Sequence, residues 1–468
     1  MSASRFERLV TWVASWSYVP PVLVDERDAD IRHHAIVIGS AGYPLKIRLG
    51  GQNTDLWDLL EHRRMEDPEF QEYLNEMIDH LRGRYDNGTC RNGVMVIIHG
   101  GNEAPHSTIN LTLKLYERIE RAGYYPVFIN WDASLWRSYV QQLLHVRSGV
   151  YNPRPAAWAL FYVVPDVLRS IMLLPSAFWL YVRLLWHSRE EYQFPTSLNL
   201  GKFTTPKLKE AGWWPGGLTV SITRFLVSTI VQVAALLVTG AGVPRAWENL
   251  LRRTRAMFRA PREFEWGSAP DGTSYQDCEG AMAVFLRRLA TTVTSCPGMK
   301  VTFLAHSMGS MIANDALQYW RELPVIIDET LHGRGMHIDS IVYMAPACST
   351  RSFAAAVGPI LAKQTDARAY VLTLHPRLEA AQRDWHGMIT GSALEWIEGV
   401  LATPHSYLDR MLGKWDNALR TLHIYPDGVR DRLHFKSFSY NEPKKPSSHS
   451  AFYHPDLDPP FWSQRFWW

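Results

Sequence analysis

The sequence VTFLAHSMGSMIANDAL, from Val301 to Leu317, decides the fold. Its first five residues are apolar or β-branched, as in a buried strand, and the residues after Gly309 repeat small and apolar side chains with helical spacing. The turn between them, AHSMG, differs from the pattern G-x-S-x-G only in having Ala305 for the first glycine. A serine nucleophile on such a turn has strained backbone geometry and needs small residues two positions to either side. The stretch therefore predicts that Ser307 is a nucleophile, the alternative being a chance match to a short motif.

A glycine-rich turn earlier in the chain provides a second part of the same chemistry. The sequence VIIHGGNE is a short apolar run ended by Gly100-Gly101, which is typical of a strand buried on both faces. Acyl transfer by a serine needs N–H donors for the oxyanion that develops on the substrate. We expect Met308, at the start of the helix, to supply one donor, and Gly101 or Asn102 to supply the other.

The general base is expected to be a histidine in the loop after the last strand, because it must reach the serine from a separate loop. The loop KPSSHSAFYHP places His449 among serine and proline residues and makes it the first candidate. His454 and His434 are alternatives. His99 and His306 flank the two turns and are expected to shape the pocket or to bond the backbone.

The third member of the triad should be a carboxylate that follows the strand AYVLTLHP. Glu379 is the first carboxylate after that strand and Asp384 is the next. Asp427, after the sequence LHIYP, is a third choice. The alternative interpretation of each is an ordinary surface carboxylate.

Strand-like and helix-like segments alternate along the chain, which predicts a parallel sheet. The predicted strands are GVMVIIHGG, YPVFINWD, KVTFLAHS, IDSIVYMAP, AYVLTLHP and a last strand near LRTLHIYP. The sequence HHAIVIGSAGYPLKIRL alternates around a glycine and predicts a hairpin. DPEFQEYLNEMIDHLRGRY and STINLTLKLYERIERAGY have helical spacing. The fold class is therefore α/β, a mostly parallel sheet flanked by helices, with a long apolar helical insertion.

The alternation stops in the middle of the chain, which suggests four segments. They are an N-terminal apolar segment (1–29), a first part of the core (30–135), the insertion (136–269), and a second part of the core with an aromatic tail (270–468). The first segment resembles a signal peptide, but Glu7, Pro20-Pro21 and the lack of an A-x-A site favour a surface-docking segment. We expect the aromatic tail, PPFWSQRFWW, to pack over the edge of the fold, the alternative being an anchor in the membrane interface.

The insertion has the composition of a membrane-associated region. Phe225–Pro244 contains no charge, and a membrane span needs ~20 largely apolar residues. Ala156–Trp186 is as apolar except for Asp166, Arg169 and Arg183, and the first two could pair on one helix face. Because the strands on both sides of the insertion belong to one predicted sheet, the number of crossings must be even or zero. We therefore expect a helical hairpin or two interfacial helices, the alternative being an apolar lid. The trailing Arg252, Arg253 and Arg255 favour a catalytic domain on the cytoplasmic side.

Composition excludes several other classes of function. The net charge of +3 is too balanced for a nucleic-acid binder, and no basic run is interleaved with aromatic residues. The four cysteines are far apart and contain no CxxC pair, which fits reduced thiols. We expect no metal and no cofactor, because the sequence contains no HExxH, phosphate-loop or dinucleotide motif. Nothing in the sequence indicates an oligomeric state.

The strand ends together resemble those of the α/β-hydrolase superfamily. The segments that carry this resemblance are VIIHGGNE, FINWDAS, AHSMGS, IVYMAPACS and VLTLHPR. They are most similar to an uncharacterised bacterial serine esterase-like branch, over roughly residues 30–135 and 270–455. The resemblance implies the triad order serine, acid, histidine, and insertions that often contact lipid. It implies no particular substrate.

The sequence thus predicts a serine hydrolase that cleaves a carboxylic ester of a lipid or of another hydrophobic acyl group. Ser307, His449 and Glu379 would form its triad. One alternative is a soluble thioesterase or peptidase with an apolar lid. Another is a membrane-anchored, hydrolase-like scaffold without catalytic activity.

Overall fold

The computed structural model describes most of the predicted core. The described residues are 22–49, 65–101, 103, 105–144, 146–147, 150–151, 155–187, 192–193, 197–199, 207–208, 243–260, 278–296, 298–327, 337–384, 389–402, 404–439 and 443–468. The predictions for Asn102 and most of Phe225–Pro244 lie outside the described residues, as does most of the N-terminal segment.

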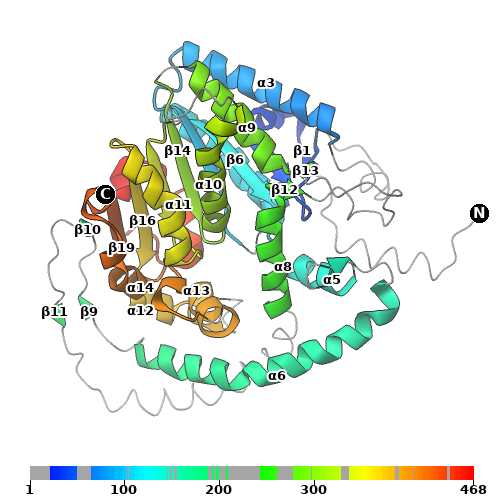
Figure 1. The fold of residues 1–468 in the computed structure, drawn as a ribbon, viewed down its shortest axis with the longest axis vertical. Helices are drawn as coiled ribbons and strands as arrows, with labels where there is room; N and C mark the ends of the chain where they lie inside the picture. Colours follow the sequence, from blue (N-terminus) through cyan, green and yellow to red (C-terminus); the bar gives the residue numbers. More distant parts are fainter. Residues whose placement is uncertain are drawn as a thin grey trace, which may run out of the picture. The chain divides into compact units, whose positions relative to one another are not determined.

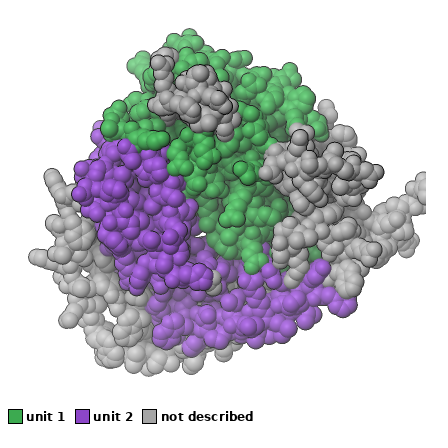
Figure 2. All heavy atoms as spheres, viewed as in Figure 1, with its two compact units in different colours: residues 1–159, 246–341, 363–367 green, residues 160–245, 342–362, 368–468 purple. Residues whose placement is uncertain are grey.

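The main strands form a mostly parallel, mixed sheet with flanking helices, which confirms the predicted α/β class (Figure 1). The chain divides into two compact units, coloured separately in Figure 2. Unit 1 comprises residues 1–159, 246–341 and 363–367. Unit 2 comprises residues 160–245, 342–362 and 368–468. Strand β15 (Ser340–Met344) carries the chain from one to the other.

Unit 1 contains the strands in the order β14-β5-β6-β2-β3. Their bounds are Val301–His306, Val94–Ile98, Tyr125–Trp131, Ala35–Ile38 and Pro44–Leu45. All residues of β14, β5 and β6 are buried, as expected for continuous apolar runs in parallel strands. Strand β3 is antiparallel to β2, so the predicted hairpin is confirmed. Its turn contains Gly42 at a φ of +84°, where an added Cβ would clash with the carbonyl of Ala256.

The main helices of unit 1 each bury several of their side chains. They are α3 (Asp67–Asp86), α4 (Pro105–Arg121), α5 (Leu135–Leu144), α9 (Ala281–Ser295), α10 (Gly309–Ile327) and most of α8 (Val243–Ala256). In α3, Phe70, Leu74, Met77 and Leu81 recur at helical spacing and are buried. Helix α9 packs against both α3 and α10. Helix α10 begins two residues after Ser307 and therefore fixes the direction in which the chain leaves β14.

Unit 2 contains the strand order β15-β16-β19-β10. The last three have the bounds Arg368–Leu374, Leu433–Phe438 and Ser197–Asn199. Strands β16 and β19 are parallel, and β10, from the middle of the predicted insertion, is antiparallel to β19. Short helices α12 (Pro376–Ala381), α13 (Ala393–Trp396), α14 (Trp415–Arg420) and α15 (Asp427–Arg430) follow β16. Helix α11 (Thr350–Lys363) lies between β15 and β16 in sequence, and α6 (Pro155–His187) belongs mostly to this unit.

The prediction of a last strand near LRTLHIYP is wrong. Those residues form the end of α14 and a 3-10 turn, Leu422–Ile424, and the last strand is β19. Trp415 and Ala418 are buried at a spacing of one helical turn, and the Thr421 hydroxyl donates to the carbonyl of Asn417 as in a helix. The predicted packing of the aromatic tail is confirmed, because Phe466 and Trp467 are buried and the Trp467 indole donates to the carbonyl of Phe461.

Candidate active site

Ser307 occupies a strained turn between β14 and α10. Its φ is +50°, in the left-handed region that costs a non-glycine residue ~1–2 kcal/mol. The amide of Ser310 donates to the carbonyl of Ser307 at 3.1 Å, and the Ser310 hydroxyl donates to the same oxygen at 2.6 Å. The turn is therefore held in place by the first residues of the helix. This is the strand–turn–helix context that the sequence predicted around Ser307.

Gly309 is required by the close approach of this turn to the end of β5. A Cβ added to Gly309 would lie 2.4 Å from the carbonyl oxygen of Ile98 and 2.6 Å from that of His99. Both are backbone atoms, so no side-chain rotation could relieve the contact. On the other side of Ser307, Ala305 pairs with Ile98 in a fully buried register. The small residues of AHSMG are therefore explained by packing against β5.

The glycine turn after β5 lies directly against Ser307 and Met308. A Cβ on Gly100 would lie 2.9 Å from the Cβ of Ser307 and 2.7 Å from Nδ1 of His306. A Cβ on Gly101 would lie 2.5 Å from the sulfur of Met308. The structure therefore brings the HGG segment and the serine turn together within unit 1, although they are far apart in sequence. The backbone of Gly100 and Gly101 therefore borders Ser307 and Met308.

His99 is a buried ring whose hydrogen bonds orient the glycine turn. Its Nε2 accepts the backbone N–H of Trp131 at 3.0 Å, so in the neutral ring Nδ1 carries the proton and donates to the carbonyl of Gly100 at 2.7 Å. Burial lowers the pKa of His99 to about 4, which keeps it neutral near pH 7. Since the C=O and N–H of a trans peptide point in opposite directions, this bond turns the N–H of Gly101 away from His99. The expectation that His99 bonds the backbone is confirmed.

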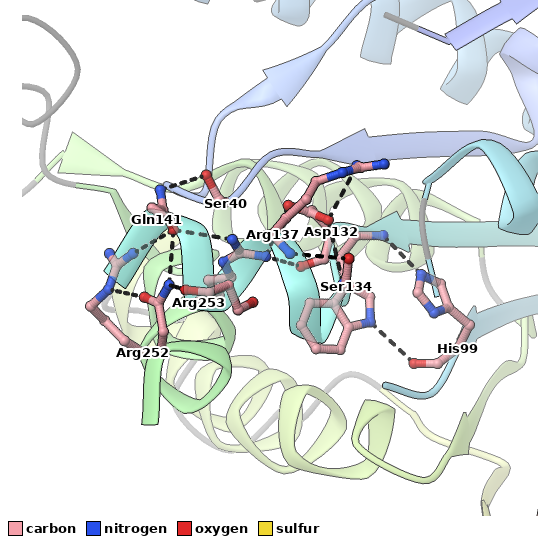
Figure 3. A network of polar contacts seen from close by, with 11 residues as sticks. Ser40, His99, Asp132, Ser134, Arg137, Gln141, Arg252 and Arg253 are labelled. Carbon is pink, nitrogen blue, oxygen red and sulfur yellow. Dashed lines mark hydrogen bonds and ion pairs between the residues drawn. The ribbon is translucent and has the colours of Figure 1, made fainter. Parts of the chain in front are cut away.

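A buried ion pair holds helix α8 against the end of β6 (Figure 3). Arg253 donates to the carboxylate of Asp132 at 2.9 Å and to its carbonyl at 2.7 Å, and it also donates to Gln141 at 3.1 Å. Both charged side chains are almost completely buried. Arg252 bonds Asn249 and Gln141 in the same network. Arg253 is therefore buried in this network and Arg252 is half-buried beside it.

In unit 2, the candidate base is linked to the helix that carries the candidate acid. His449 is the first residue of a 3-10 turn, His449–Tyr453, and is buried. Its backbone N–H donates to the side-chain oxygen of Gln382 at 2.9 Å. Gln382 caps the C-terminus of α12, which contains Glu379. No sequence motif indicates Gln382, because its partner lies in a distant loop.

Glu379 is almost completely buried, which is rare for a carboxylate without a structural or catalytic role. Its backbone is fixed on both sides, because its N–H donates to the carbonyl of His375 and its carbonyl accepts from Ser392. Asp427, by contrast, has a side chain that is 94% exposed and pairs with Arg430. Asp384 lies in a short strand, Arg383–Asp384, with its side chain outside the described part of the structure. As a candidate for the carboxylate of the triad, Glu379 is therefore favoured over Asp427 by its burial.

The two alternative histidines lie in environments that suit other roles. The side chain of His454 is 59% exposed, and its Nδ1 accepts the backbone N–H of Asp456. His434 lies in β19 and stacks on Tyr370 and against Trp468, with ring centroids 5.1 and 4.1 Å away. Burial lowers the pKa of His434 to about 4. The buried loop position of His449 is the one that suits a base.

The candidate residues thus form two groups. Ser307, Met308 and Gly101 lie together in unit 1, and His449 and Glu379 lie in unit 2, where Gln382 links their segments. Among the described residues, no cluster of three or more histidine, cysteine or acidic side chains could hold a metal ion.

No protein-family model, curated protein or solved structure matches this chain. The resemblance to the α/β-hydrolase superfamily therefore rests on the motif residues alone.

Proposed function

We propose that the protein is a serine hydrolase that cleaves carboxylic esters of hydrophobic acyl groups through an acyl-enzyme on Ser307. The observation that carries this proposal is the strained Ser307, with its φ of +50° at a buried strand end and the Gly100-Gly101 turn against it. A serine that merely ends a strand needs neither a left-handed backbone nor glycine amides beside it. Strain of this kind is concentrated at functional sites.

In the proposed reaction, the Ser307 oxygen attacks the ester carbonyl carbon while His449 accepts the hydroxyl proton. The oxyanion that forms accepts hydrogen bonds from the N–H groups of Met308 and Gly101. The intermediate then collapses, the carbon–oxygen bond to the alcohol breaks, and His449 returns the proton to the leaving alkoxide. Water repeats the sequence on the acyl-enzyme and regenerates Ser307. Glu379 orients His449 and stabilises its charged form.

Two observations support the roles given to unit 2. Glu379 is buried next to a fixed backbone, whereas Asp427 is a solvated surface carboxylate. Gln382 holds the backbone of His449 from the same helix that carries Glu379, so both side chains would be positioned by one element. The hydrophobic class of acyl group is supported by the apolar composition of the insertion.

The proposal is tested with a series of p-nitrophenyl esters of increasing acyl length. The wild type should hydrolyse them, with kcat/KM rising from short to medium chains, and Ser307→Ala should lower kcat/KM by at least ~1,000-fold. Ser340→Ala, which removes a buried hydroxyl bonded to Asp339, is the matched control and should keep wild-type activity. Equal activity of Ser307→Ala and wild type would contradict the proposal.

A further inference from the structure

Helix α6 exposes a continuous apolar face. Among the described residues, it contains the one helical segment long and apolar enough to cross a membrane, Phe161–Leu184, by length and composition alone. The large apolar side chains of α6 with the highest exposed fractions are Met172, Trp179 and Phe161, at 79%, 70% and 66%. From residue 161 to residue 179 the exposed residues are Phe161, Val164, Pro165, Leu168, Ile171, Met172, Pro175, Ser176, Phe178 and Trp179. None of them carries a charge.

The opposite face of α6 packs on the rest of unit 2. Ala177, Leu180 and Leu184 are buried in a cluster with Ala380 and Val400. The packing is close, because a Cβ on Gly391 would lie 2.5 Å from Leu184 and a Cβ on Gly399 would lie 3.0 Å from Leu180. This face of the helix is therefore part of the protein core.

The charged side chains on the packed face are paired within the protein. Asp166 is buried and accepts from Arg245 at 3.3 Å. Arg183 donates to Glu395 at 3.0 Å, and Glu395 also pairs with Lys414. Two of the three charges that interrupt the apolar sequence, Asp166 and Arg183, are therefore paired within unit 2, and the third, Arg169, is half-buried.

We propose that the exposed face of α6 binds the acyl-chain region of one leaflet of a lipid bilayer, with the helix lying in the plane of the membrane. An uncharged face of aromatic, aliphatic and methionine side chains complements lipid chains, which offer neither charges nor hydrogen bonds. Contiguous exposed apolar patches larger than a few hundred Å² are rare on soluble monomers. This inference goes beyond the proposed catalysis and does not depend on it.

The structure favours an in-plane orientation over a membrane span. A spanning α6 would have to leave its cluster with Ala380 and Val400 and break the pairs of Asp166 and Arg183.

Lipid also suits this face better than a second copy of the chain. Protein interfaces carry about one hydrogen bond per 100–200 Å² and a polar rim. From residue 161 to residue 179, the exposed side chains offer only the hydroxyl of Ser176 and the indole N–H of Trp179. A lipid leaflet requires no such partners.

The test uses the full chain and neutral phosphatidylcholine vesicles in a flotation assay. The wild type should float with the vesicles and stay bound at about 0.5 M NaCl, because screening acts on charges and the face has none. Met172→Glu and Trp179→Glu should each weaken partitioning by about tenfold or more. Trp136→Glu, at a tryptophan that is 62% exposed on α5, is the matched control and should bind within about twofold of wild type.

The inference would be overturned if the wild type did not float, or if Trp179→Glu and Trp136→Glu bound the vesicles equally. Loss of a dimer in Trp179→Glu would show that the face binds a second copy of the chain instead. Retention of the wild type on membranes after an alkaline carbonate wash would indicate a membrane span. Ser307→Ala should float like the wild type, and Trp179→Glu should keep full activity on a short water-soluble ester. A failure of membrane binding is thereby distinguished from a failure of the catalytic proposal.

Discussion

Gly100 and Ser307 approach each other so closely that a Cβ on the glycine would lie 2.9 Å from the Cβ of the serine. The same added atom would lie 2.7 Å from the ring of His306. Two segments far apart in sequence therefore meet with no room for a side chain at Gly100. In the proposed reaction, the oxyanion would be held beside this contact.

Replacing Gly100 by alanine should displace the glycine turn from Ser307. We expect Gly100→Ala to lower kcat by about 100-fold, the typical cost of losing one oxyanion donor. Gly83→Ala is the control, because a Cβ at Gly83 in α3 would meet no atom within 4 Å. Ester hydrolysis by both variants at matched thermal stability checks this prediction, and normal kcat in Gly100→Ala would contradict it.

Gln382 should act as a positioning residue for His449. In Gln382→Met the backbone N–H of His449 loses its acceptor, so we expect kcat to fall by about tenfold with little change in KM. The pH profile of kcat should also shift, which a purely structural role would not cause. Gln364→Met is the matched control, because Gln364 likewise accepts a backbone N–H, from Ile338. If Gln382→Met and Gln364→Met lowered stability equally and neither changed the pH profile of kcat, Gln382 would not be a positioning residue for His449.

The Asp132–Arg253 pair should stabilise the attachment of α8. Because Arg253→Met removes the closest partner of a buried carboxylate and leaves Arg137 at 3.5 Å as its remaining ion-pair partner, we expect it to lower the free energy of unfolding by about 3 kcal/mol. The double variant Arg253→Met/Asp132→Asn should recover part of that loss. Arg430→Met, at an exposed pair with Asp427, should cost less than about 1 kcal/mol. Chemical denaturation measures all three, and an additive double variant would refute the coupling.

Buried histidines should make the protein sensitive to acid. Burial lowers the pKa of both His34 and His99 to about 4, below the value of 6.5 in the unfolded chain. Their contribution to stability is fully present above pH 6.5 and is lost as the pH falls toward 4, because the unfolded state then binds more protons. Each shift corresponds to about 3 kcal/mol. His99→Gln should flatten the dependence of the unfolding free energy on pH in this window, and an unchanged slope would contradict the assignment.

The sequence predicts those parts of the fold that depend on local patterns. The buried strands, the hairpin before Leu45 and the strand–turn–helix around Ser307 follow from apolar periodicity and small residues, and the structure contains them. Gly309 and Gly100 were recognisable as turn residues, but the backbone and side-chain atoms that forbid a Cβ there come from other segments.

Interactions between distant segments were not predictable in this way. The sequence LRTLHIYP has strand-like composition, yet it begins within the end of α14, where Trp415 and Ala418 bury one helical face. The last strand is therefore β19, which comes later in the chain. Arg253 follows an apolar run as a membrane-flanking arginine does, but its partner Asp132 is far away in sequence. Gln382 carries no local signal because its role depends on the fold of the His449 loop.

The central claim, that Ser307 is the nucleophile, is tested most directly by reaction with a fluorophosphonate followed by mass spectrometry of the peptide that contains Val301–Leu317. We predict one phosphonyl adduct on Ser307 in the wild type and none in Ser307→Ala, with labelling retained in Ser340→Ala. Labelling that persists in Ser307→Ala, or a wild type that hydrolyses esters without forming the adduct, would contradict the account.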